Sequence, residues 1–172
     1  MIIFGFRSTS LILSMDFSEV TEGILQGLFA WEDKLRELSP DTISNNRNSQ
    51  NRTIKQILGH MVDSASNNTH RIVHLQYQPG PFSFPNYATN GNNERWIAIQ
   101  NYQDEDWENL VQYWKFIHIH LIHVINNVNP DKLDNEWVSG PEYGNIRLKD
   151  MITDFLRHFR LHLGEIQELI DK

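Results

Sequence analysis

The chain has 172 residues, of which 40% are hydrophobic and 22% are charged, a balance that predicts one globular domain and excludes a disordered protein. The formal net charge is −7 at pH 7 and no run of Lys or Arg forms a basic stripe, so we expect neither nucleic acid nor a membrane as a partner. Cysteine is absent, which excludes disulfides, thiolate metal sites and Cys nucleophiles, and any thiol in the chemistry must come from another molecule. Nothing argues for an oxidising compartment, and we expect a cytoplasmic protein.

The first fourteen residues are mildly apolar but make a poor signal peptide. Arg7 and Ser8 interrupt them, and they have no basic n-region and no small-residue cleavage site. They are also too short to span a bilayer as a helix. We treat residues 1–14 as an extension of unknown role and expect one domain over residues 15–172, with Asp16 or Ser18 able to cap the first helix.

Four segments show helical periodicity, separated by linkers rich in Pro, Gly and Asn. The predicted helices run over about residues 17–38, 53–77, 104–128 and 148–169. An Asn-rich loop precedes the second helix, which Asn51 or Thr53 can cap. Prolines after Tyr77 end it and open a long crossover, in which we expect a short helix over residues 93–100. With no strand-like alternation, the pattern predicts an all-α fold, a four-helix bundle with a long crossover between the second and third helices.

Two pairs among the eight histidines have the i,i+4 spacing that places side chains on one helix face. His70 and His74 lie opposite the apolar stripe of their helix, on a face that we expect to be solvated. His158 and His162 flank the apolar arc of the last helix, so they point into or beside the core. Burying two imidazoles costs free energy unless their nitrogens find partners, and either a metal ion or a water network meets that need.

His60 is the candidate for a third ligand. It lies with Ser64 and Arg71 on a row at the edge of the second helix's apolar stripe, which suggests a pocket wall, although an edge at the bundle surface would look the same. One i,i+4 pair and one residue from a facing helix can converge as an open three-histidine site of the kind found in catalytic zinc centres. We therefore predict His60, His158 and His162 as the metal ligands.

The third helix carries three further histidines: His118, His120 and His123. No two of them share a face. We expect amphipathic edge residues, among which His120 is the one that could line the pocket.

Two segments resemble signatures of one known family. Residues 52–64, RTIKQILGHMVDS, resemble the second-helix signature of the DinB superfamily, especially its YfiT-like branch, in which the histidine is a metal ligand. Arg52 stands where a Trp is common, a departure outside the metal site. Residues 158–166, HFRLHLGEI, resemble the last-helix signature with its H-x-x-x-H motif. The resemblance extends over nearly all of residues 15–172.

The resemblance implies an up-down-down-up bundle, commonly a homodimer, with a zinc or nickel ion on the three matched histidines. Relatives in this family include metal-dependent S-transferases that use bacillithiol or mycothiol, and a thiol-dependent isomerase. We therefore expect an enzyme that acts through its bound metal and transfers a low-molecular-weight thiol, bacillithiol-like, to an electrophilic small-molecule substrate. The candidates for contacts with a ligand histidine or with the substrate are Glu165, Asp154, Arg71 and Ser64.

Two alternatives stay open. One is a metal-dependent hydrolase that uses metal-bound hydroxide, although the sequence has no HExxH-type glutamate. The other is a non-catalytic bundle that binds a metal or a ligand, which a closed fourth coordination position would favour. A Ser/His/Asp hydrolase is disfavoured, because the chain has no G-x-S-x-G turn.

Overall fold

The computed structural model describes residues 16–172 except 79 and 142–143. Both the predicted extension, residues 1–14, and the predicted start of the domain at residue 15 lie outside the described residues. The bundle consists of four long helices: α1 (Ser18–Arg36), α3 (Ile54–Tyr77), α5 (Trp107–Asn126) and α6 (Leu148–Ile170). The predicted helices and the predicted bundle fold are confirmed. Among the described residues, no helix is both long and apolar enough to cross a membrane.

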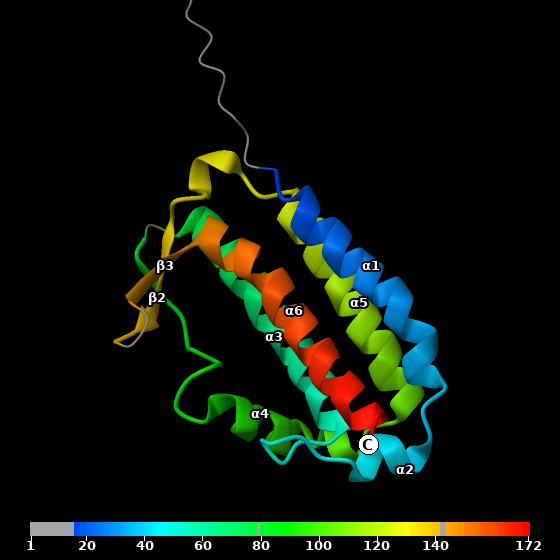
Figure 1. The fold of residues 1–172 in the computed structure, drawn as a ribbon. Helices are drawn as coiled ribbons and strands as arrows, with labels where there is room; N and C mark the ends of the chain where they lie inside the picture. The colour runs from blue at the N-terminus through cyan, green and yellow to red at the C-terminus, as the bar shows by residue number, and fades with distance from the viewer. Residues whose placement is uncertain (1–15, 79, 142–143) are drawn as a thin grey trace, which may run out of the picture.

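The order of the helices explains why one connection is long. α1 and α3 do not pair with each other; each packs against both α5 and α6. α1 and α6 run in one direction and α3 and α5 in the other (Figure 1). Since α3 and α5 are parallel neighbours, the chain must return along the whole bundle between them, and the crossover does this. The topology is the up-down-down-up arrangement that the family resemblance implies.

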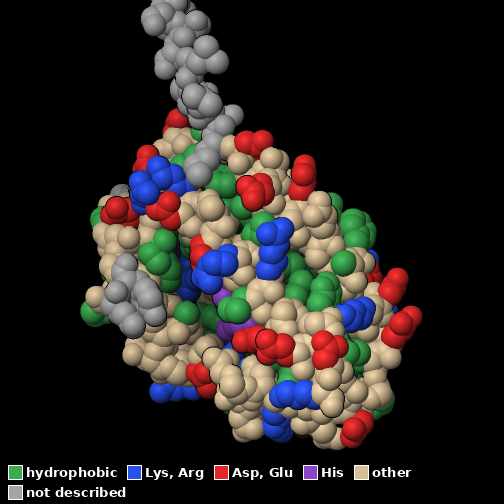
Figure 2. Space-filling view, viewed as in Figure 1, with side chains coloured by type: hydrophobic (Ala, Val, Ile, Leu, Met, Phe, Trp, Pro, Cys, Tyr) green, Lys and Arg blue, Asp and Glu red, His purple; other side chains and the backbone are tan. Residues whose placement is uncertain are grey.

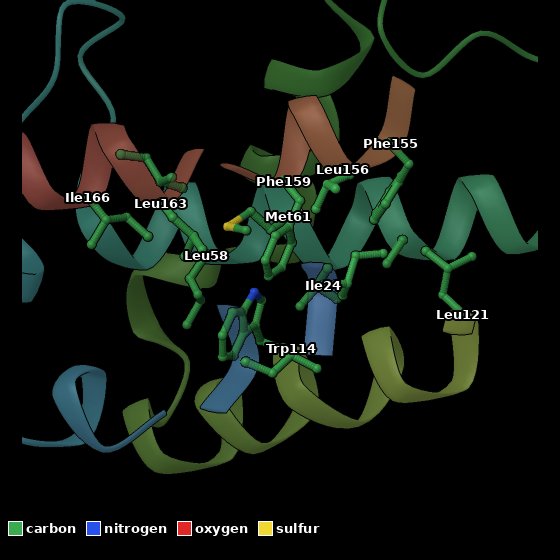
Figure 3. Packing of buried hydrophobic residues seen from close by; sticks show 14 of the residues in the cluster. Ile24, Leu58, Met61, Trp114, Leu121, Phe155, Leu156, Phe159, Leu163 and Ile166 are labelled. Atoms are coloured by element: carbon green, nitrogen blue, oxygen red, sulfur yellow. The ribbon is translucent and has the colours of Figure 1, made fainter. Parts of the chain in front are cut away.

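The interior is built from apolar side chains at helical spacing, which α3, α5 and α6 all direct to the same space. Figure 3 shows Met61 of α3 above Trp114 of α5, with Phe159 of α6 beside them. The rings of Trp114 and Phe159 are stacked with centroids 6.0 Å apart. This layer fixes α6 against α3, the two helices that carry the predicted ligands.

The start of α3 is fixed by a capping box. The Thr53 hydroxyl accepts from the Gln56 backbone N–H, and the Gln56 side chain accepts from the Thr53 N–H. Thr53 rather than Asn51 is therefore the cap. At the start of α1, the Asp16 carboxylate accepts from the Ser18 N–H at 2.8 Å.

The structure contains elements that the sequence analysis did not predict. A short helix, α2 (Pro40–Asn45), follows α1, and Ser39 caps it. A three-stranded sheet packs beside the bundle: β1 (Phe82–Ser83), β2 (Glu136–Gly140) and β3 (Gly144–Arg147). β2 and β3 are antiparallel and β1 is parallel to β2. The expectation of no strands is therefore wrong here, because strands of two to five residues are too short for alternation to be recognised.

The crossover contains the predicted short helix, α4 (Asn92–Gln100), followed by a 3-10 turn that carries Tyr102. The Tyr102 ring lies directly on the α3 backbone at Gly59, where a Cβ would overlap it. Glycine at this position therefore lets the crossover approach α3 closely. The contact brings residues of the crossover within reach of His60, the next residue along α3.

Candidate metal centre

Three imidazoles from two helices converge at one point. His60 comes from α3, and His158 and His162 come from successive turns of α6. One ring nitrogen of each lies within 4.8 Å of the corresponding atoms of the other two. The Nε2 atoms of His158 and His162 are 3.0 Å apart. Within the described part of the chain, no fourth His, Cys, Asp or Glu joins this group, so three nitrogen donors would leave a metal ion an open position.

A hydrogen-bond chain from the crossover holds His60. The Tyr87 hydroxyl lies 2.6 Å from His60 Nδ1 and donates to Asp63 Oδ2 at 3.3 Å. Asp63 also accepts from the Tyr102 hydroxyl and from Gln100 Nε2, each at 2.6 Å. Because a carboxylate only accepts, the Tyr87 oxygen is left to accept from His60 Nδ1–H. This tautomer leaves the lone pair of His60 on Nε2, as a metal ligand requires.

The two α6 histidines also have partners on the nitrogen that faces away from the centre. His162 Nδ1 lies 2.8 Å from Glu165 Oε2, and His158 Nδ1 lies 3.4 Å from the Ser64 hydroxyl. Carboxylates and hydroxyls in these positions orient ligand imidazoles in metalloproteins. The three residues thus fit a divalent ion both in donor type and in the direction of the remaining nitrogens.

Burial favours the neutral, metal-binding form of the imidazoles. Burial, together with the neighbouring histidines, lowers the pKa of His60 to about 2 and that of His158 to about 4. The hydrogen bond from His162 lowers the pKa of Glu165, so this carboxylate is charged at neutral pH. The site therefore combines neutral imidazoles at His60 and His158 with an anionic carboxylate at Glu165, which contacts His162.

A cavity of about 480 Å³ opens beside the histidines. Figure 2 shows histidine side chains in a recess of this face of the molecule. Polar residues of α3 form one part of its wall, and residues of β2, β3 and α6 form other parts: His60, Ser64, Asn68, Arg71, Trp137, Ile146, Met151, Phe155 and His158. An organic molecule of modest size can therefore lie against the centre.

The sequence-predicted contact residues are only partly brought together. Glu165 and Ser64 contact ligand histidines, whereas the Asp154 carboxylate, which lines the cavity, pairs with Arg157 Nε at 2.6 Å. Arg71 lines the cavity but touches none of the three histidines through a hydrogen bond in the described residues.

The other histidines lie outside the centre. His118 is buried, with its Nδ1 donating to the Trp114 carbonyl at 2.7 Å, so it is a core residue and the expectation of an amphipathic edge residue is wrong. His120 is exposed and does not line the cavity. His70 is exposed, and His74 is half-buried because its ring stacks on Phe82.

Sequence reasoning missed the crossover residues that hold His60, namely Tyr87, Gln100 and Tyr102. They lie in a segment with little periodicity, and their role depends on contacts more than 20 positions apart in the chain. Asp63, one turn after His60 on α3, gave no signal, because helical periodicity places it opposite the apolar stripe, yet it is buried. A buried carboxylate requires hydrogen-bond donors from another element.

Comparisons with known proteins agree with this geometry. A family model of the DinB superfamily matches residues 30–166. Among solved structures, YfiT from Bacillus subtilis is similar over 96% of this chain and 91% of its own, with a TM-score of 0.75 and 14% identity. It is described as "a probable metal-dependent hydrolase with an unusual four-helix bundle topology". No curated protein matches the sequence. At this identity the likeness to YfiT shows the fold, and the predicted family resemblance is confirmed.

Proposed function

Since the chain belongs to the DinB superfamily, we propose that it is a metal-dependent enzyme that transfers a low-molecular-weight thiol to an electrophilic small molecule. The observation that carries this proposal is the set of three convergent imidazoles with no fourth protein ligand in the described residues. Structural metal sites are coordinatively closed, whereas catalytic sites keep a position for substrate. The adjoining cavity supplies room for that substrate.

A zinc or nickel ion on His60, His158 and His162 would supply Lewis acidity, which lowers the pKa of a thiol or a water so that a nucleophile exists at neutral pH. Tyr87 and Glu165 hold two of the imidazoles in position through their Nδ1 atoms. In the transfer, sulfur forms a bond to the electrophilic carbon, the bond from that carbon to the leaving group breaks with its electron pair, and the thiol proton is released. The chain has no cysteine, so the thiol is a second substrate.

The carboxylates around the centre favour thiol transfer over hydrolysis. Activating water calls for a general base near the ion, yet Glu165 is bonded to His162 and Asp154 to Arg157. A thiol has a pKa of about 8.5 and needs less assistance to ionise. Hydrolysis is the second candidate, because the structurally similar YfiT is described as a metal-dependent hydrolase.

Mass spectrometry of the reaction products tests the proposal. Protein loaded with zinc or nickel is incubated with a panel of cellular thiols, including glutathione, bacillithiol and mycothiol, and with an aryl chloride as electrophile. We expect the thioether to form above the uncatalysed background with at least one thiol. His60→Ala, loaded in the same way, should return the yield to background, whereas His120→Ala should not.

Two outcomes of this experiment would contradict the assignment of thiol transfer. If no thiol yields a thioether above background, the transfer reaction is excluded. If the same loaded protein instead hydrolyses esters or amides in a manner that His60→Ala abolishes, hydrolysis takes its place.

A further inference from the structure

Arg71 carries a buried guanidinium that no described carboxylate neutralises. The side chain is only 6% exposed, and its Nε and Nη2 atoms have no hydrogen-bond partner among the described residues. Its guanidinium carbon lies 4.0 Å from the centre of the Trp137 ring. Stacking on an aromatic face leaves the N–H groups at the guanidinium edge without acceptors. Because a buried charge costs free energy unless it is paired, an anion bound to Arg71 would lower the free energy of the buried guanidinium.

The cavity beside the histidines is the side from which such an anion can arrive. His60 and Arg71 both line it, and Ser64 and Asn68 line it on the helix turns between them. Arg71 lies eleven positions after His60 on α3, which is about 16 Å along the helix axis. The cavity therefore connects the metal centre to the guanidinium within the length of a small organic molecule.

The remaining charged side chains at this cavity already have partners. Asp154 pairs with Arg157 at 2.6 Å, and Asp150 pairs with Arg147 at 2.7 Å. Apolar side chains form much of the rest of the wall: Trp137, Ile146, Met151 and Phe155. In the described residues, Arg71 is thus the cation of the wall that still lacks a counter-charge, and it is surrounded by apolar surface.

We propose that the cavity binds a small amphipathic anion, whose carboxylate or phosphate group pairs with Arg71 and whose apolar body lies against Trp137. The reacting end of this molecule then lies at the three histidines. Guanidinium binds either anion through charge-assisted hydrogen bonds. The inference rests on the proposed function only for the role of this molecule as a substrate; the binding itself needs neither metal nor turnover.

The test compares ligands with similar alkyl tails that differ in the head group. Chelator-treated protein is titrated with hexanoate, hexyl phosphate and hexanamide, and binding is followed by ligand-detected NMR. At least one of the two anions should bind about 10- to 100-fold more tightly than hexanamide. Arg71→Met should remove this preference and leave hexanamide binding unchanged, whereas the matched Arg157→Met at the same cavity should keep the preference.

The outcomes separate this inference from the proposed function. The proposed anion site is overturned if the wild type binds the anions and the amide with equal affinity. It is also overturned if Arg71→Met keeps the preference for anions. The wild-type comparison already decides whether an anion is preferred, and Arg71→Gln replaces Arg71→Met if circular dichroism shows that the latter does not fold. The metal is absent from this titration, so a lack of anion binding leaves the result of the thiol-transfer experiment unaffected. In the same way, a lack of thiol transfer leaves the result of the titration unaffected. The anion that binds more tightly, hexanoate or hexyl phosphate, identifies whether the head group that Arg71 binds is a carboxylate or a phosphate.

Discussion

Tyr87 joins His60 to Asp63, so one hydroxyl determines how a candidate ligand is oriented. Replacing Tyr87 with Phe keeps the ring and removes the acceptor of His60 Nδ1–H. Loss of such an outer partner typically costs about 10- to 100-fold in metal affinity. We expect a loss of this size for zinc, measured by competition with a chelating dye.

The matched control is Tyr113→Phe, because Tyr113 is an exposed tyrosine on α5. Its zinc affinity should equal that of the wild type. Unchanged affinity in Tyr87→Phe would show that the hydroxyl does not orient the ligand.

His118 gives the bundle a pH-dependent stability that is separate from the metal centre. Burial lowers its pKa to about 4 from an unfolded value of 6.5. The unfolded state therefore binds the proton first as the pH falls, and stability is present above pH 6.5 and is lost progressively towards pH 4. Replacement by Gln should reduce this slope by up to about 1.4 kcal/mol per pH unit. Urea unfolding at several pH values measures it, and identical slopes in both proteins would contradict the assignment.

The approach of the crossover to α3 depends on Gly59. A Cβ there would overlap the Tyr102 ring, which would have to move together with its hydrogen bond to Asp63. We expect Gly59→Ala to destabilise the protein by about 1–3 kcal/mol, as overpacking does in other cores. Gly164→Ala is the control, because a Cβ at this position on α6 has no atom within 4 Å.

Gly164→Ala should be neutral or stabilise the helix by up to about 1 kcal/mol. Urea unfolding provides both values. Equal effects of the two substitutions would mean that the contact with Tyr102 is not what Gly59 permits.

The length of an element decided whether the sequence revealed it. The long helices carry several turns of apolar periodicity, and signals such as the Thr53–Gln56 capping box mark their ends. α2 has six residues and β1 has two, so neither repeats a pattern often enough to be recognised. In β2 the buried Trp137 and Ser139 do alternate with the more exposed Val138, but only over one repeat.

In the candidate site, too, the sequence revealed what depends on local helix geometry and missed what depends on tertiary contacts. His158 and His162 are adjacent through helix geometry, so their spacing alone placed them together. Adding His60 required a contact between helices about a hundred residues apart, which its place at the edge of the apolar stripe suggested and the family resemblance supported. The crossover network and the burial of His118 depend on tertiary packing that no local pattern encodes.

The homodimer that the family resemblance implies stays a prediction for the whole molecule. The neighbouring helices α1 and α5 expose large aromatic side chains, among them Phe29 at 69% and Phe116 at 58%. Such side chains are candidates for an interface between two copies. If the chain dimerises through them, Phe29→Asp combined with Phe116→Asp should give a monomer in size-exclusion chromatography with light scattering.

Ile99→Asp is the control for this experiment, because Ile99 is even more exposed than the two phenylalanines but lies on α4. It should leave the mass unchanged. A monomeric wild type, or a double variant that still dimerises, would contradict the assignment.

Metal content measured by elemental analysis tests the central claim most directly, since every functional proposal for the centre requires His60, His158 and His162 to hold an ion. The wild-type protein, loaded with zinc or nickel and passed through desalting, should retain one ion per chain. His60→Ala, His158→Ala and His162→Ala should each lose it, whereas His74→Ala should not. A wild-type protein that retains no ion, or a His60→Ala variant that keeps its full complement, would contradict the account.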